Sequence, residues 1–286
     1  MIFGPTLLCI ILFVTTPFAW ASSVPLVPGR YFDRVVIFVF ENENYANVHA
    51  DPYFGSLAST HNVELTNYYA TTHPSQPNYI SMITGSTDGV FFDFNSNIDG
   101  DSIVDLLEAK GISWKSYQQA YPGNCDTSSS IGTYYRKHNP FISMTNIQSN
   151  ATRCANIVNA DQLDADIRNK LVPQFVFFTP DINNDGHNTN LTVASNWFQS
   201  YLEPRIKLDN FTENTMFIST WDEAEDYVGP NQVQTVLFGP SFHLTPSLTD
   251  SSNNRYDHYS ILKTIEENWD LGSLGENDVG AVPFSF

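Results

Sequence analysis

Basic side chains are scarce in this chain of 286 residues. It has 13 Lys and Arg against 31 Asp and Glu, which gives a formal net charge of −18 at pH 7. The sequence shows no basic stripe that could follow a phosphate backbone, and this argues against nucleic-acid binding. An anionic substrate would instead need local positive charge from a metal ion, from helix N-termini or from the few basic residues.

Long apolar runs are also rare. One covers residues 7–14 and is followed by small residues at positions 19 and 21, which is typical of a secretory signal with its cleavage site. It is too short to span a bilayer, and no later segment is long enough to form a transmembrane span. We therefore expect a signal peptide over residues 1–21 and a secreted, extracellular protein with one domain over residues 22–286.

Cysteine is scarce as well, with three residues in the chain. Cys9 lies inside the expected signal peptide, which leaves Cys125 and Cys154 in the mature protein. Because an even number of cysteines in an oxidising compartment favours pairing, we predict a disulfide between these two; two free buried thiols are the alternative. Three sequons agree with the secretory route and are candidate glycosylation sites: Asn150, Asn190 and Asn210.

Apolar and aromatic residues are plentiful and gather in short runs that alternate with helical patterns. Continuous apolar runs are typical of parallel strands covered on both faces. The alternation predicts the α/β fold class, with a three-layer α/β/α sandwich around a mainly parallel central sheet. The expected strands are 35–40, 112–117, 174–179, 215–221 and 233–238, the expected helices are 76–84, 102–110, 161–171, 194–208 and 257–268, and the segment before residue 70 and the Gly, Ser and Asn-rich segment 121–159 are expected to be irregular.

Acidic residues follow three of these strands. Glu41 and Asn42 come after the first, Asp181 follows another, and Asp222 and Glu223 follow a third. Because an open parallel sheet binds its ligands outside the carboxyl ends of its strands, we expect these side chains to gather at one edge. Gathered carboxylates repel one another unless a metal ion, protons or cationic side chains offset their charge. Each acid alone could instead cap the next helix, but the three groups together favour a cation site.

A serine at the start of a predicted helix is the second informative feature. Ser75 precedes an apolar helix that ends at Gly85. One interpretation is a helix N-cap, which contributes about 1 kcal/mol to stability. The other is a nucleophile, because the free N–H groups and the dipole at a helix N-terminus stabilise both an attacking oxygen and the phosphoryl group that it attacks. The two interpretations do not exclude each other.

The segment 181–187 places oxygen ligands at positions one, three and five of a calcium-binding loop, and glycine at position six. Position twelve, however, is Thr192 rather than the bidentate Glu, and a strand rather than a helix precedes the loop. Because Asp181, Asp185 and His187 combine carboxylates with an imidazole, the loop suits a transition-metal or mixed site better.

Two further groups of residues have two interpretations each. His258 begins an amphipathic helix, where a histidine is either a cap or surface residue or a ligand. Lys137 and His138 lie beside Arg136 in a rare concentration of positive charge, which either stays solvated at the surface or neutralises a bound phosphate.

Six motifs occur in this order along the chain: Phe40-Glu41-Asn42-Glu43-Asn44-Tyr45, His73-Pro74-Ser75-Gln76-Pro77-Asn78-Tyr79, Lys137-His138-Asn139-Pro140-Phe141, Pro180-Asp181 with Asp185-Gly186-His187, Trp221-Asp222-Glu223, and His258-Tyr259-Ser260. Through them the chain resembles the secreted phosphoesterase family that includes fungal acid phosphatases and bacterial phospholipases C, a branch related to the alkaline phosphatase superfamily. The resemblance covers essentially the whole mature chain.

The resemblance implies roles for the candidate residues. Ser75 would attack phosphorus and form a phosphoserine intermediate, with Asn78 steadying a phosphate oxygen. Glu-Asn replaces a ligating Asp of the wider superfamily and Asp-Glu replaces an Asp-His pair, so the identity and number of the metal ions stay open. A divalent metal ion would be held by Glu41, Asn42, Asp222 and Glu223, and a second metal, together with the groups that protonate the leaving oxygen or activate water, would involve Asp181, Asp185, His187 and His258.

We therefore expect a secreted, metal-dependent acid phosphatase that hydrolyses phosphomonoesters of a small molecule or lipid headgroup. Lys137 and His138 are the candidate substrate-binding pair. Two alternatives remain open. A phospholipase C or other phosphodiesterase would need an apolar or aromatic entrance for the second substituent, and a secreted glycoprotein could bind metal or phosphate without turnover.

Overall fold

The computed structural model describes residues 1, 25–57, 62–240 and 254–286. The expected signal peptide over residues 1–21 lies outside the described residues, apart from Met1. Among the described residues, no helix combines the length and apolar character needed to cross a membrane.

A seven-stranded sheet runs through the centre of the molecule, with the strand order β2-β10-β9-β1-β8-β4-β7. Its parallel strands are β7 (Ile157–Asn159), β4 (Trp114–Gln118), β8 (Phe175–Thr179), β1 (Arg34–Phe40) and β9 (Thr215–Trp221). At one edge, β10 (Val236–Phe238) pairs antiparallel with β9, and β2 (Val63–Glu64) pairs antiparallel with β10. The predicted α/β class with a mainly parallel sheet is confirmed.

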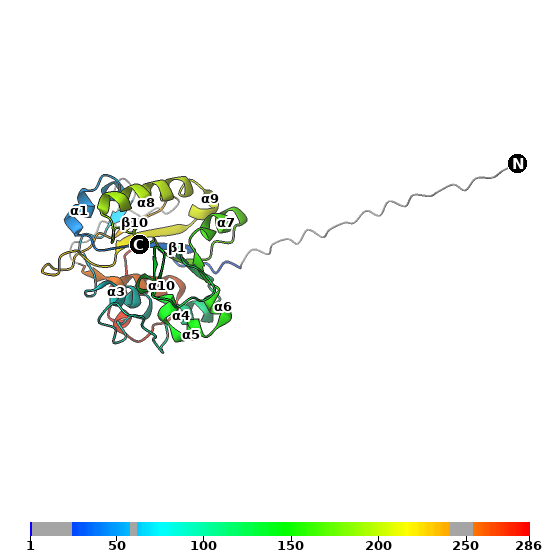
Figure 1. Cartoon of the computed structure of the whole chain (residues 1–286), viewed down its shortest axis with the longest axis horizontal. Helices are drawn as coiled ribbons and strands as arrows, with labels where there is room; N and C mark the ends of the chain where they lie inside the picture. Colours follow the sequence, from blue (N-terminus) through cyan, green and yellow to red (C-terminus); the bar gives the residue numbers. More distant parts are fainter. Residues whose placement is uncertain (2–24, 58–61, 241–253) are drawn as a thin grey trace.

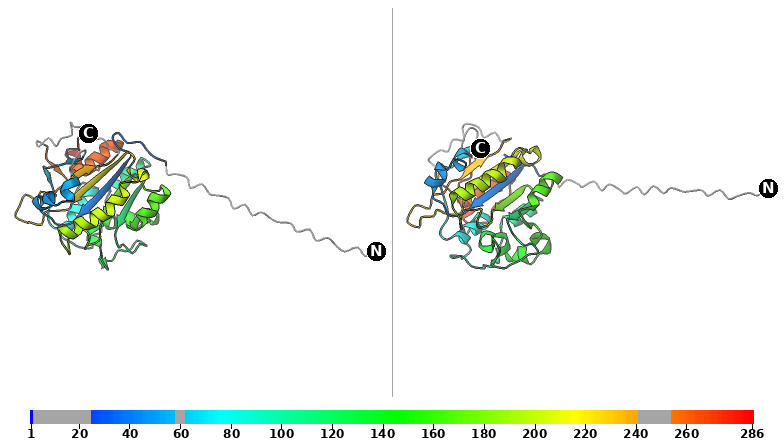
Figure 2. Two further views of the ribbon diagram at one scale, coloured as in Figure 1. Left: turned by 90° about the horizontal axis from the view of Figure 1, so that it is seen from above. Right: turned by 45° about the horizontal axis from the view of Figure 1, so that its top comes forward.

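Helices cover both faces of this sheet (Figures 1 and 2). The helix α8 (Leu191–Arg205) lies on one face, and α3 (Ser75–Thr84), α4 (Ile103–Ala109) and α10 (His258–Trp269) lie on the other. The strands β8 and β9 are buried along their whole length, which explains why their sequences are continuously apolar rather than alternating. The three predicted layers are therefore present.

Aromatic side chains fill the layer between the sheet and α8. The ring of Phe40, at the end of β1, lies 4.8 Å from that of Phe198 on α8 and 5.3 Å from that of Trp221 at the end of β9. These three side chains are fully buried. Because interlocked aromatic packing leaves little room for movement, it fixes the strand ends from which Glu41 and Asp222 follow.

Several short elements complete the fold. They are α1 (Tyr45–Ala50), α2 (Phe54–Leu57), β3 (Tyr68–Tyr69), β5 (Ser130–Ile131), β6 (Tyr134–Tyr135), η1 (Arg136–His138), η2 (Phe141–Ser143), α5 (Thr145–Gln148), α6 (Ala151–Cys154), α7 (Gln162–Asn169), α9 (Asp209–Thr212), β11 (Tyr256–Asp257) and η4 (Asn277–Val279).

Four of the local predictions need correction. The segments before residue 70 and over 121–159 are not simply irregular, because the first holds two short helices and the second supplies β7 to the central sheet. The strand expected at 233–238 is limited to Val236–Phe238. Ser75 is the first residue of α3 rather than its N-cap; Pro74 occupies the cap position, which leaves the serine hydroxyl free for other partners.

The predicted disulfide is present. Cys125 and Cys154 are bonded across 29 positions of sequence and tie the loop after β4 to the short helix α6. The sequon residues Asn150 and Asn190 are exposed and cap α6 and α8 with their side chains. Asn210 is partly buried, and its amide donates a hydrogen bond to the carbonyl of Ile167.

Candidate active site

The pairing of β1 with β9 brings two acidic residues side by side. Phe40 is in register with Trp221, and the next residues along the two strands are Glu41 and Asp222. The Asp222 amide donates a 2.9 Å hydrogen bond to the Phe40 carbonyl and continues the ladder by one step. Glu41, Asp222 and Glu223 are all fully buried. The acids that end these two strands therefore share one buried position at the carboxyl edge of the sheet.

The hydroxyl of Ser75 lies within this acidic cluster. Its Oγ is 2.9 Å from Glu41 Oε2, 3.3 Å from Glu223 Oε1 and 3.4 Å from Asn42 Oδ1. The residue is 1 % exposed, and the whole of α3 is buried. A hydroxyl carries one proton, so it can donate to one of these three oxygens at a time. The other oxygens face it without a hydrogen atom between them.

Asn42 has an unusual conformation and environment. Its φ of 44° is left-handed, and its backbone N–H donates to Asp222 Oδ1 at 3.1 Å. The side-chain oxygen faces acceptors only. If the amide were rotated, its NH₂ group would donate to Glu41 Oε2, Asp222 Oδ1 and Glu223 Oε1 at 3.0, 3.2 and 3.3 Å. Either a cation between these oxygens or the rotated amide satisfies them.

Crowding and burial disfavour negative charge in the cluster. Burial, followed by the repulsion from Glu41, raises the pKa of Asp222 well above its ordinary value and also raises the pKa of Glu223. Burial is also the main cause that raises the pKa of Glu41. A cation at this position would reverse these shifts, because it stabilises the ionised carboxylates.

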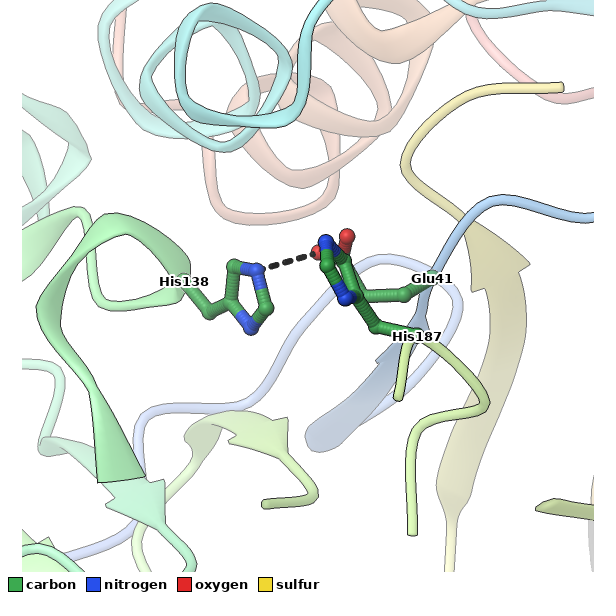
Figure 3. A group of neighbouring side chains, drawn as sticks. All are labelled: Glu41, His138 and His187. Carbon is green, nitrogen blue, oxygen red and sulfur yellow. Dashed lines mark ion pairs between the residues drawn. The ribbon is translucent and has the colours of Figure 1, made fainter. Parts of the chain in front are cut away.

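The residues present fit a divalent cation. Asp222 Oδ2 is buried without a hydrogen-bond partner, and Glu41 Oε1 has the ring of His138 as a polar neighbour at 3.1 Å. Oxygen donors of this kind suit magnesium, calcium or manganese, whereas added imidazole donors suit transition metals. Glu41, His138 and His187 form a second set, whose ligand atoms lie within 4.8 Å of one another. Figure 3 shows these three side chains converging from the end of β1, from η1 and from the loop after β8.

His138 connects Glu41 with the loop after β8. Its Nε2 lies 3.1 Å from Glu41 Oε1 and its Nδ1 lies 3.2 Å from Asp185 Oδ2. Burial, with smaller contributions from Lys137 and His187, lowers the pKa of His138 well below its ordinary value. A neutral imidazole is the form that binds metal ions. The sequence suggested His138 as a phosphate-binding residue, whereas its position suits a ligand or an orienting group.

Lys137 and His187 lie at the more open side of the cluster. Lys137 Nζ donates to Nε2 of His187 at 3.1 Å, and His187 Nδ1 donates to the Asn188 side chain at 2.9 Å. Burial alone would lower the pKa of Lys137, but the charges of Glu41 and Asp93 outweigh it and raise the pKa. Lys137 is therefore a permanent positive charge facing an acidic site.

Three candidate residues use their polar atoms to hold the surrounding backbone. The oxygens of Asp181 accept from the backbone N–H groups of Asn183 and Asn184 and from the amide of Asn184, which closes the turn after β8. The side chain of Asn78 accepts from the N–H groups of Thr71 and Thr72 and donates to the carbonyls of Thr72 and Pro74. The ring of His258 bonds the Asp222 carbonyl at 2.7 Å and the Tyr68 hydroxyl at 3.0 Å.

Two further residues of the site had no assigned role in the sequence. His73 Nδ1 contacts Glu223 Oε2, and its ring stacks on Tyr227 with 4.2 Å between centroids. Asp93 accepts from the Gln76 backbone N–H at 3.0 Å and pairs with a lysine of the site. The position of His73 two residues before Ser75 was a usable signal. Asp93 offered none, because its loop reaches the site only through the tertiary fold.

Comparison with known proteins identifies the group to which this fold and site belong. A model described as the Phosphoesterase family matches residues 43–272. The chain belongs to the phosphoesterase family. The match begins just after Glu41 and Asn42 and includes the other residues of the acidic cluster. The family resemblance expected from the sequence motifs is therefore confirmed.

Curated relatives of this chain include fungal acid phosphatases. The chain is 39 % identical over 272 residues to the probable acid phosphatase of Kluyveromyces lactis, covering 90 % of this chain and 63 % of the relative. It is 37 % identical to the phosphate-repressible acid phosphatase of Penicillium chrysogenum, covering 91 % and 64 %. The chain thus spans somewhat less than two thirds of the length of these relatives. The phosphatidylinositol-3-phosphatase of Mycobacterium tuberculosis is 27 % identical, with 90 % and 85 % covered.

Solved structures show the same fold at low sequence identity. A protein of the alkaline phosphatase superfamily from Vibrio parahaemolyticus superposes with a TM-score of 0.56 at 12 % identity, covering 94 % of this chain and 76 % of that one. The lipoteichoic acid synthase of Listeria monocytogenes gives a TM-score of 0.53 at 8 % identity, covering 88 % and 78 %. The sheet and its helical layers therefore have the same overall arrangement as in these solved structures.

Proposed function

We propose that this protein is a secreted, metal-dependent acid phosphatase that hydrolyses phosphomonoesters through a phosphoserine intermediate. One observation carries the proposal: the Ser75 hydroxyl lies within 3.4 Å of three oxygen-bearing side chains that follow β1 and β9. A serine that served only as a helix cap would bond its own helix instead. The identities to fungal acid phosphatases support the same activity.

A divalent cation held by Glu41, Asn42, Asp222 and Glu223 would neutralise charge at the phosphoryl group and lower the pKa of the serine hydroxyl. The protein supplies the rest of the site. Burial keeps bulk water from the hydroxyl, and the positive end of the α3 dipole faces the incoming anion. The positive charge of Lys137 adds to the attraction of the substrate phosphate.

The reaction consists of two displacements at phosphorus. In the first, the Ser75 hydroxyl gives up its proton to a carboxylate of the cluster such as Glu41, the Oγ–P bond forms, the P–O bond to the substrate alcohol breaks, and the leaving oxygen takes up one proton. In the second, water gives up one proton and forms a new bond to phosphorus, the Oγ–P bond breaks, the serine oxygen takes up a proton, and phosphate is released. We assign the proton transfers to His187 and Asp185, since His187 lies at the open side of the site and Asp185 contacts His138. His258 supports Asp222 through its backbone.

Replacing the nucleophile tests the proposal directly. Ser75→Ala removes the attacking oxygen, and we expect the rate of p-nitrophenyl phosphate hydrolysis to fall by a factor of about 10⁴ or more. Ser81→Ala, in the same buried helix, is the matched control, because its hydroxyl bonds Thr71 and the Asn78 carbonyl instead. Turnover by Ser75→Ala within tenfold of wild type, with an unchanged melting temperature, would refute the proposed nucleophile.

The preference for monoesters has its own test. A monoester presents one substituent, whereas a phosphodiester or phospholipid also needs space for a second. We expect p-nitrophenyl phosphate to be hydrolysed faster than bis(p-nitrophenyl) phosphate and p-nitrophenyl phosphocholine at each acidic pH. Faster turnover of either diester would replace the phosphatase proposal with a phosphodiesterase or phospholipase C.

A further inference from the structure

An open pocket of about 550 Å³ adjoins the acidic cluster. Apart from Lys137, the residues that line this pocket have no catalytic or metal-binding role in the proposed function. The loop after α3 forms one side and the β5–β6 hairpin forms the other. Its lining includes Asp93, Phe94, Asn95, Ser130, Tyr135 and Lys137.

Hydrogen bonds join the pocket to the residue that follows the nucleophile. Asp93 accepts from the backbone N–H of Gln76, the residue after Ser75, at 3.0 Å. The Gln76 side chain in turn accepts from the Phe94 backbone N–H at 2.8 Å. On the other side, Lys137 donates to His187 at 3.1 Å. The substituent of a phosphoryl group at Ser75 would therefore extend toward this pocket.

The lining is rich in hydrogen-bonding groups and close to neutral in charge. Lys137 and Asp93 form a 2.9 Å ion pair, so neither charge is left alone. Asn95, Ser130 and Tyr135 add an amide and two hydroxyls, and the ring of Phe94 is 66 % exposed. An aromatic face next to clustered polar groups matches a ring that carries C–H bonds on its face and hydroxyls on its edge.

We propose that this pocket binds the alcohol part of the substrate and that this alcohol is an uncharged polyhydroxylated ring, such as a sugar or a cyclitol. The inference rests on the proposed phosphatase function. A simple aryl group would contact the Phe94 ring but make no hydrogen bonds to the amide and hydroxyls, so it would gain less binding energy than a hydroxylated ring. A second anionic group would be disfavoured because the Asp93 carboxylate lines the pocket and repels it.

The experiment compares kcat/KM for glucose 6-phosphate with kcat/KM for phenyl phosphate. We expect the wild-type protein to prefer the sugar phosphate. In Asn95→Ala, Ser130→Ala and Tyr135→Phe, the ratio of the two values should fall about tenfold, equivalent to about 1.4 kcal/mol of lost recognition. Ser128→Ala is the matched control for Ser130→Ala, because Ser128 is exposed nearby but does not line the pocket.

Equal loss for both substrates in the pocket variants, or a wild-type preference for phenyl phosphate, would overturn the inference. If the wild-type protein hydrolyses neither ester, the phosphatase proposal fails. Binding of a sugar ring in the pocket is then tested separately by saturation-transfer NMR with glucose 6-phosphate. Transfer to the sugar ring protons that is weakened by Asn95→Ala supports the pocket, and transfer that is unaffected by this change, or absent in wild type, refutes it.

Discussion

At the residue scale, the acidic cluster combines groups that destabilise one another in the absence of a cation. Glu41, Asp222 and Glu223 are fully buried around a single hydroxyl. Removing one member of such a set lowers the repulsion among the others, but it also removes a donor for the metal ion. Metal affinity and the stability of the metal-free protein should therefore respond in opposite directions to the same substitution.

Asp222→Asn is the substitution that separates these effects, because it keeps the size of the side chain and the oxygen that accepts from the Asn42 N–H. We expect bound divalent metal, measured by elemental analysis after dialysis, to fall well below the wild-type stoichiometry. In the presence of a chelator, the melting temperature should rise by about 2–4 °C for each kcal/mol of repulsion removed.

Asp270→Asn provides the control. It also removes one negative charge, but from a side chain that is fully exposed to solvent. Unchanged metal content in Asp222→Asn would contradict the ligand assignment. A lower melting temperature in the chelated variant would contradict the repulsion that burial imposes on the cluster.

At the scale of elements, the loop between β4 and β7 is held by a covalent bond. The disulfide between Cys125 and Cys154 closes a segment whose two ends are 29 positions apart. This segment contains the β5–β6 hairpin and η1, which carry the far wall of the pocket and His138. The disulfide thus reduces the conformational freedom of the unfolded chain and also constrains part of the site.

Replacing both cysteines by serine should lower the free energy of unfolding by about 3–4 kcal/mol, since the closed loop is intermediate in length. Denaturant titration of the double variant and of wild type under non-oxidising, non-reducing conditions measures this difference. Equal stability of the two proteins would show that the bond adds nothing to the folded state.

A second pair of elements, α10 and η4, encloses a buried carboxyl group. Glu266 is 1 % exposed, and both its side-chain oxygens lack a hydrogen-bond partner. Burial, followed by the nearby Asp278, raises the pKa of Glu266 to about 8. The folded protein therefore holds a proton at this position at pH values where the unfolded chain has released it.

This shift predicts the direction of the pH dependence. Because the pKa is raised on folding, the contribution of Glu266 is most favourable below about pH 4.5 and is lost progressively as the pH rises to about 8. The slope for one proton is at most about 1.4 kcal/mol per pH unit. The free energy of unfolding of Glu266→Gln, measured as a function of pH, should not show this part of the decline.

Glu267→Gln is the matched control, since the neighbouring side chain is partly exposed and pairs with Lys263. It should keep the wild-type slope between pH 4.5 and 8. If Glu266→Gln and wild type lose stability in parallel over this range, Glu266 is not the group that binds the proton.

At the scale of the whole molecule, the sequence predicted the layers of the fold and the gathering at one edge of the acids that follow β1 and β9. Both depend on short, continuous apolar runs, whose burial dominates the fold. The strand β7 was not predicted, because it has three residues and lies in a polar segment. Its pairing with β4 is supplied by tertiary context rather than by its own composition.

The same distinction applies to the site. Glu41, Asn42, Asp222, Glu223 and Ser75 lie next to strand or helix ends, so their meeting followed from the expected topology. Asp93 and the contact of His138 with Asp185 depend on the path of long loops, which local sequence does not determine.

The central claim is that Ser75 attacks phosphorus and carries the phosphoryl group between two displacements. The stereochemical course at an isotopically chiral phosphomonoester tests this most directly, because each in-line displacement inverts the configuration at phosphorus. The account predicts overall retention when the phosphoryl group is transferred to an acceptor alcohol. Overall inversion would show a single direct displacement and would contradict it.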